Sequence, residues 1–93
     1  MAEQNTGGTT VKLLYFAWVR EKVGRAEEAI ELPAGIETVG ELVGWMKSRG
    51  PEYAAAFERS GVIRAAIDQK HVLPSASIRG AREIAFFPPV TGG

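Results

Sequence analysis

The chain ends in Glu83-Ile84-Ala85-Phe86-Phe87-Pro88-Pro89-Val90-Thr91-Gly92-Gly93, the stretch around which the rest of the sequence is arranged. Residues 83–87 are mostly aromatic and aliphatic and are followed by breakers, which predicts a β-strand. Pro88 and Pro89 have no backbone N–H, so the hydrogen bonds of this strand must stop there. Residues that precede proline prefer an extended backbone, so we expect residues 88–93 to leave the sheet as a tail spanning roughly 20 Å.

The tip of this tail, Gly92-Gly93, carries no side chains. Such a tip can enter a channel that is too narrow for other residues and present its terminal carboxylate there. Glycine is also common at frayed chain ends. These two residues alone therefore leave both interpretations open.

The composition of the chain bounds the classes of protein to consider. Its 93 residues suffice for one small domain, and 45% hydrophobic with 24% charged residues is typical of a globular protein. Eleven basic residues balance eleven acidic ones, which does not favour binding to nucleic acid or to an anionic membrane. No apolar run approaches the ~20 residues of a membrane span, and no secretory signal is present. We therefore expect a cytoplasmic protein with neither nucleic acid nor membrane as a partner.

The residues that usually carry catalysis are scarce. The chain has no cysteine and one histidine, His71, which we expect to be an exposed loop residue. It contains no glycine-rich phosphate loop and no cluster of metal ligands. The sequence therefore predicts a protein that is not an enzyme by itself and that binds no metal.

Local patterns predict the secondary structure before this last strand. Thr38 and Glu41 match a capping box, and the apolar residues after them recur at helical spacing. Pro51 suits the first turn of a second, short helix. The predicted elements are a polar, disordered leader over 1–10, strands over 11–17 and 26–32 joined as a hairpin through a helical turn at 18–23, helices over 39–49 and 51–57, a strand over 62–69, an edge strand over 71–73 and a turn over 79–82.

Three stretches resemble a known family, the small, sulfur-carrying subunit of molybdopterin synthase among the ubiquitin-like sulfur carriers. They are Leu14-Tyr15-Phe16-Ala17-Trp18-Val19-Arg20-Glu21-Lys22-Val23-Gly24, Ala65-Ala66-Ile67-Asp68-Gln69 and Ala85-Phe86-Phe87-Pro88-Pro89-Val90-Thr91-Gly92-Gly93. The likeness runs from about Val11 to Gly93. One turn departs from the family, because Arg79-Gly80-Ala81-Arg82 stands where an acidic Asp-Gly-Asp type of turn is usual.

The order of the elements and the resemblance predict the same fold. One principal helix can cover one face of a mixed sheet of four to five strands, which is an α+β arrangement. The resemblance implies the ubiquitin-like β-grasp fold, with the first and last strands parallel neighbours in the centre. We therefore divide the chain into a leader (1–10), a β-grasp domain (11–87) and an extended tail (88–93).

The resemblance also implies a chemistry for Gly93. A ubiquitin-activating-like adenylyltransferase would use ATP to adenylate its carboxylate. A sulfur donor such as a cysteine desulfurase or rhodanese would then convert it to a thiocarboxylate. That group would donate sulfur to cyclic pyranopterin phosphate and so build the dithiolene of molybdopterin, with no cofactor stably bound. Because the chain has no cysteine to hold a persulfide, the terminal carboxylate is the remaining obvious carrier.

Partner binding would need a surface beside the tail. By strand alternation, Leu14 and Phe16 on the first strand and Ala85 and Phe87 on the last point away from the helix, so they would form an apolar patch. A loop or the second helix could instead cover this patch. The family's partner is a large synthase subunit, expected in a heterotetramer of two small and two large subunits. The tail residues expected to contact it are Pro88, Pro89, Val90, Thr91 and Gly92.

Two other interpretations of the tail stay open. The chain could carry sulfur for thiazole, cysteine or tRNA thiolation, or act as a ubiquitin-like protein modifier, with the same terminal chemistry. It could also be a β-grasp binding module with an inert tail.

Overall fold

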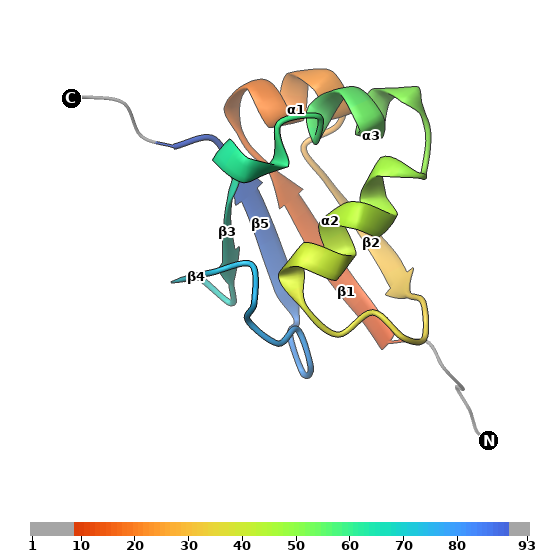
Figure 1. The fold of residues 1–93 in the computed structure, drawn as a ribbon, viewed down its shortest axis with the longest axis vertical. Helices are drawn as coiled ribbons and strands as arrows, with labels where there is room; N and C mark the ends of the chain where they lie inside the picture. Colours follow the sequence, from red (N-terminus) through yellow and green to blue (C-terminus); the bar gives the residue numbers. More distant parts are fainter. Residues whose placement is uncertain (1–8, 90–93) are drawn as a thin grey trace.

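The computed structural model describes residues 9–89, which form a single five-stranded mixed sheet with helices packed on it (Figure 1). The strand order is β2-β1-β5-β3-β4. The strands are β1 (Thr9–Tyr15), β2 (Glu27–Leu32), β3 (Arg64–Ile67), β4 (Lys70–Val72) and β5 (Glu83–Phe87). The helices are α1 (Ala17–Val23), α2 (Val39–Lys47), α3 (Pro51–Ala56) and the short 3₁₀ helix η1 (Ser60–Val62).

The centre of the sheet is built from the two ends of the described chain. β1 and β5 are parallel, with Leu13 opposite Ile84 and Tyr15 opposite Phe86. β2 pairs antiparallel with β1, and β3 pairs antiparallel with β5 and β4. The predicted α+β class and the central parallel pair are therefore confirmed.

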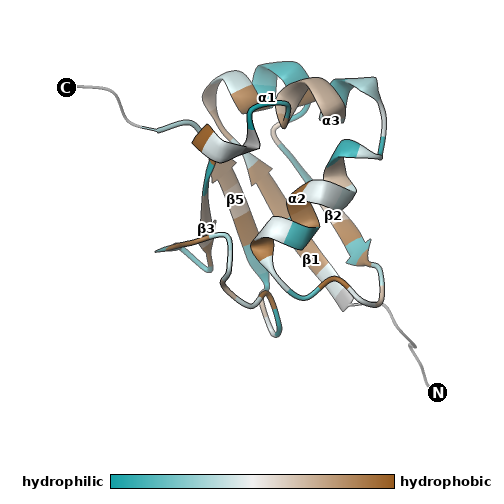
Figure 2. Ribbon diagram, in the orientation of Figure 1, coloured by the Kyte–Doolittle hydropathy of each residue, from teal (hydrophilic) through white to brown (hydrophobic). Residues whose placement is uncertain are grey.

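One face of the sheet forms the hydrophobic core. Alternation along β1 buries Val11, Leu13 and Tyr15, each at most 1% exposed. Figure 2 shows the hydrophobic residues concentrated along β1 and β5, beneath the helices. The ring of Phe57 packs edge-on against Phe86 with centroids 5.1 Å apart. Phe57 is the C-cap residue of α3, so this contact packs the end of the short helix against the central strand β5.

The principal helix α2 begins where the sequence predicted. The Oγ1 of Thr38 accepts a hydrogen bond from the backbone N–H of Glu41 at 3.1 Å. The Oε1 of Glu41 accepts from the N–H of Glu37 at 2.8 Å, one residue earlier than in the usual capping box. The buried residues of α2 are Val39, Leu42 and Met46.

All three α-helices lie on the same side of the sheet (Figure 1). α1 is terminated by its C-cap residue Gly24, whose φ of 92° is in the left-handed region that glycine adopts readily. α3 begins at Pro51 and packs against α1 and α2. Within residues 9–89 no helix covers the opposite face, so α3 does not provide the cover that the sequence left possible. No helix in this part of the chain is both long and apolar enough to span a membrane.

Several predicted boundaries were wrong. β1 begins at Thr9, so Thr9 and Thr10 pair with β2 rather than belonging to the leader. β1 ends at Tyr15 rather than at residue 17, because α1 begins at Ala17. The connection between β1 and β2 is the helix α1 (Ala17–Val23), which begins one residue before the helical turn predicted over 18–23.

The third and fourth strands also differ from their predicted limits. β3 is shorter than predicted, because η1 precedes it and Asp68-Gln69 turns the chain with positive φ values of 48° and 75°. His71 lies in the edge strand β4, close to the edge strand predicted over 71–73, and is exposed as predicted, although we expected it in a loop. Residues 1–8 of the predicted leader lie outside the described part of the chain.

Candidate functional site

The root of the predicted tail is held at the centre of the sheet. β5 is flanked by β1 and β3 and ends at Phe87, as predicted. Pro88 and Pro89 follow outside the strand and are half-buried. At the other end of β5, the Oδ1 of Asp68 accepts hydrogen bonds from the N–H groups of Arg82 (3.1 Å) and Glu83 (3.0 Å). The strand that carries the tail is therefore fixed along its length. The predicted site residues Val90, Thr91, Gly92 and Gly93 lie outside the described residues.

The sheet surface that faces away from the helices is apolar beside this root. We call the side chains of Leu14, Ala66, Ala85 and Phe87 the open face. Leu14 and Ala66 are the register neighbours of Ala85 on either side. Ala85 and Ala66 are only 8% and 6% exposed although no helix covers them. Leu14 and Phe87 are half-buried. The predicted shared face of Leu14, Ala85 and Phe87 is confirmed.

Phe16 joins this surface from a different position than expected. It was predicted to lie in the first strand, but it is the N-cap residue of α1. Its backbone N–H donates to the carbonyl oxygen of Phe86 at 3.1 Å, so it continues alongside β5 for one residue beyond β1. Its side chain is 48% exposed. The structure thus places an exposed aromatic residue next to the root of the tail.

The opposite flank of Phe87 is polar and was not predicted. The ring of His71 lies 5.1 Å from that of Phe87, centroid to centroid, and Arg64 is the register partner of Phe87 on β3. Neither neighbour follows from local sequence, since both depend on β3 pairing with β4 and β5. The only available signal was that His71 falls in a short alternating stretch next to a predicted turn.

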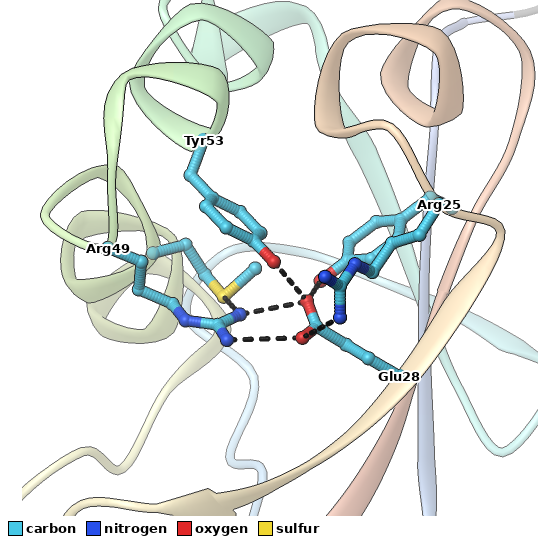
Figure 3. A network of polar contacts seen from close by, with 6 residues as sticks. Arg25, Glu28, Arg49 and Tyr53 are labelled. Carbon is cyan, nitrogen blue, oxygen red and sulfur yellow. Dashed lines mark hydrogen bonds and ion pairs between the residues drawn. The ribbon is translucent and has the colours of Figure 1, made fainter.

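A buried carboxylate network lies on the helix side of the sheet, near β2 (Figure 3). The Glu28 side chain is 7% exposed. Its Oε2 accepts from the hydroxyls of Tyr15 (2.6 Å) and Tyr53 (2.8 Å). The Nη1 and Nη2 of Arg49 donate to the two oxygens of the same carboxylate at 2.8 and 3.1 Å, and Arg25 adds a contact at 3.3 Å.

These contacts determine the charge of the network. Burial alone would raise the pKa of Glu28, but the hydrogen bonds from Arg49, Tyr15 and Tyr53 outweigh it and lower that pKa to about 2. Burial and the neighbouring carboxylate raise the pKa of Tyr15 well above its ordinary value. Glu28 is therefore ionised and fully engaged at neutral pH, which suits a structural role better than proton transfer.

Within residues 9–89, no three or more His, Asp or Glu side chains are grouped so that they could hold a metal ion. A hollow of about 330 Å³ lies between the 32–38 and 77–80 segments, at the end of the sheet where β5 begins. It thus lies at the end of β5 opposite to Pro88. The geometry concentrates the candidate site at the other end, where Phe16 and the open face surround the root of the tail.

The sequence pattern of the ThiS family matches residues 13–93, which is most of the chain. The chain belongs to the ThiS family.

Two relatives resemble this ThiS-family chain over almost their whole length. One, from Escherichia coli (strain K12), is 41% identical over 83 residues, which cover 89% of this chain and 99% of the relative. The other, from Haemophilus influenzae, is 35% identical over 83 residues with the same coverage. Both are named "Molybdopterin synthase sulfur carrier subunit".

Solved structures with the same architecture place this ThiS-family chain among the ubiquitin-like β-grasp proteins. A putative molybdopterin converting factor, subunit 1, from Pyrococcus furiosus has a TM-score of 0.67 at 27% identity, covering 87% of this chain and 98% of its own. SAMP1 from Haloferax volcanii has a TM-score of 0.67 at 20% identity, covering 91% and 100%. The second likeness concerns the fold alone.

Proposed function

We propose that this chain is the sulfur carrier of molybdopterin synthase, a non-catalytic small subunit that acts together with a large subunit. The observation that carries the proposal is the fixed central strand β5, which runs directly into Pro88-Pro89 and a Gly-Gly end. The relatives named as molybdopterin synthase sulfur carrier subunits support it, because each is aligned over 99% of its own length.

The proposed reaction takes place at the carboxylate of Gly93. An oxygen of this carboxylate attacks the α-phosphorus of ATP on an adenylyltransferase, and pyrophosphate leaves. The outer sulfur of a persulfide on a donor such as a cysteine desulfurase or rhodanese then displaces AMP, and a thiol reduces the resulting acyl disulfide, which leaves a thiocarboxylate. In the large subunit, the sulfur of this group attacks cyclic pyranopterin phosphate, and water cleaves its bond to Gly93, which restores the carboxylate; two successive carriers supply the two sulfur atoms of the dithiolene.

The contribution of this chain is positioning. A tail rooted in a central strand starts from a defined point, so its reactive end reaches the catalytic groups of the large subunit at high effective concentration. Pro88 and Pro89 reduce the conformational freedom that the tail loses on entering a channel. Because Gly92 and Gly93 have no side chains, they can pass through a channel that is too narrow for other residues.

We further propose that the large subunit binds the open face together with Phe16 and the tail. Contiguous exposed apolar surface on a small protein usually marks an interface. Here Phe16 is exposed and Leu14 and Phe87 are half-buried beside the root of the tail, so binding them would also direct the tail. The same tail chemistry would serve another sulfur pathway or a protein modifier, but the names of the relatives favour the pterin pathway.

The test compares four proteins: the unmodified chain, a chain lacking Gly93, a chain with one residue added after Gly93, and Gly93→Ala. Circular dichroism should show the same fold in all four. After incubation with ATP, the adenylyltransferase and a sulfur donor, intact mass should show sulfur on the unmodified chain only, with partial loading of Gly93→Ala. Conversion of cyclic pyranopterin phosphate by the complex should follow the same order.

The outcomes separate the alternatives. If the extended chain gains sulfur and supports conversion normally, the thiocarboxylate mechanism is wrong for this protein. If the unmodified chain gains sulfur but does not support conversion with the large subunit, it serves a different sulfur pathway. An inert tail predicts no gain of mass by any of the four proteins.

A further inference from the structure

Ala17 has a backbone conformation that alanine seldom adopts. Its φ is 54°, in the left-handed region. Among residues 9–89, only Asp68 and Gln69 share a positive φ without being glycine, and they form the two-residue turn between β3 and β4, which requires it. Ala17 lies in no hairpin turn. It joins a strand directly to a helix.

The contacts around Ala17 maintain this conformation. On one side, the N–H of Phe16 is held by the carbonyl oxygen of Phe86. On the other, the carbonyl oxygen of Phe16 accepts from the N–H groups of Val19 (3.1 Å) and Arg20 (3.3 Å), and Val19 is completely buried. A strained residue persists only where its surroundings over-determine it, and such residues cluster at functional sites.

The consequence of this conformation is seen in Phe16. Tyr15 is buried in the core at 1% exposed, while Phe16 is 48% exposed. Phe16 has an extended backbone (φ −127°, ψ 153°), so alternation after the buried Tyr15 turns its side chain away from the core, and Ala17 then starts α1 at the next residue. The chain therefore leaves the sheet directly after Phe16. The side chain of Phe16 stays exposed beside β5, the strand that carries the tail.

We propose that Ala17 is a positioning residue, whose left-handed conformation holds Phe16 outward for contact with the large subunit of the synthase. This inference rests on the proposed function. Alanine suits the role better than glycine, because glycine would adopt the same φ without strain but would also allow many other conformations. The strain at Ala17 therefore contributes to rigidity at the docking surface rather than to stability of the fold.

The test is Ala17→Gly, with Gln69→Gly as a matched control. Both changes replace a left-handed residue by glycine, so both should leave the melting temperature unchanged or raise it. Gln69 lies beside the start of β5, at the end of the sheet away from Phe16. Ala17→Gly should weaken association with the large subunit about two- to fivefold and lower the NMR order parameter of the Phe16 amide. Gln69→Gly should change neither.

A double-mutant cycle with Phe16→Ala identifies the route of the effect. If Ala17 acts through Phe16, Ala17→Gly should cause no further loss of association in the Phe16→Ala background. An equal loss in both backgrounds, or no loss in either, would overturn the inference while leaving the proposed function intact. Failure of the unmodified chain to bind the large subunit at all would overturn both.

Discussion

Glu28 shows how a single buried charge can join separate elements. Its carboxylate lies on β2 and binds Tyr15 from β1, Tyr53 from α3 and Arg49 from the segment between α2 and α3. The guanidinium of Arg49 also lies 4.3 Å from the centre of the Tyr53 ring. Removing one partner of such a pair leaves the other buried and unpaired, which is strongly destabilising. The network therefore fixes the helices to the edge of the sheet.

The first prediction concerns acid stability. The pKa of Glu28 falls from 4.5 to about 2 on folding. Because the folded pKa is the lower one, the ionised group stabilises the fold fully above pH 4.5, and this stabilisation is lost as the pH falls from there toward 2. Its size is on the order of 3 kcal/mol. Glu28→Gln should lower the melting temperature at pH 7 and flatten its decline between pH 5 and 2.

Glu31→Gln is the matched control, since Glu31 is on the same strand but exposed. It should keep both the stability at pH 7 and the pH dependence of the unmodified chain. Parallel pH profiles for Glu28→Gln and the unmodified chain would show that another group governs acid unfolding.

Sequence alone could place Glu28 but not its partners. Within the predicted strand over 26–32, alternation places Glu28 on the same side as Ile30 and Leu32, and a carboxylate in line with core positions must be paired when buried. Its hydrogen-bond partners Tyr15, Arg49 and Tyr53 lie 13, 21 and 25 positions away. No local pattern connects residues at such distances, so the network became visible only with the tertiary structure.

Among the elements, those with local start and stop signals were predicted well. Thr38, Pro51 and Gly24 each mark a helix end by their own chemistry, and each does so in the structure. The limits of β3 were predicted poorly, because Asp68-Gln69 adopts positive φ values without a glycine to announce it. Phe16 was assigned to β1 for a similar reason, since Ala17 gives no sequence signal of a turn.

The cap of α2 yields a prediction at this scale. Thr38→Ala removes the acceptor for the N–H of Glu41. We expect a loss of about 1 kcal/mol in the free energy of unfolding, and a fall of about 4–8 °C in melting temperature, measured by circular dichroism. Thr38→Ser keeps the hydroxyl and should recover most of the loss. Equal melting temperatures for the two variants would show that the hydroxyl does not cap the helix.

For the whole molecule, alternation predicted which side chains share a face, and the structure confirms it for Leu14, Ala85 and Phe87. That β1 and β5 are neighbours came from the family resemblance, because no short-range signal pairs the two ends of a chain. The flank formed by His71 and Arg64 needed the full strand order.

The open face gives the third prediction of this section. Phe87 is half-buried, so Phe87→Ala should leave the domain folded with a moderate loss of stability. It should weaken association with the large subunit by about tenfold, as expected for an aromatic residue near the centre of an interface. Both quantities are measurable by circular dichroism and isothermal titration calorimetry.

Ile36→Ala is a suitable control, because Ile36 is also half-buried but lies in the loop between β2 and α2. It should cost stability without weakening association. If Phe87→Ala is unfolded, its side chain belongs to the core, and the assignment of faces is inverted.

The parallel pairing of β1 with β5 has a consequence for biosynthesis. Among residues 9–89, β1 is made first and β5 last, so the central pair of the sheet cannot form until the chain has been made as far as Phe87. Contacts between such distant segments are typical of slow folding. A chain interrupted before Glu83 would leave β1 and β3 with unpaired edges where β5 belongs, which invites aggregation rather than function. A chain that ends before β5 therefore cannot form the central strand pair that holds the root of the tail.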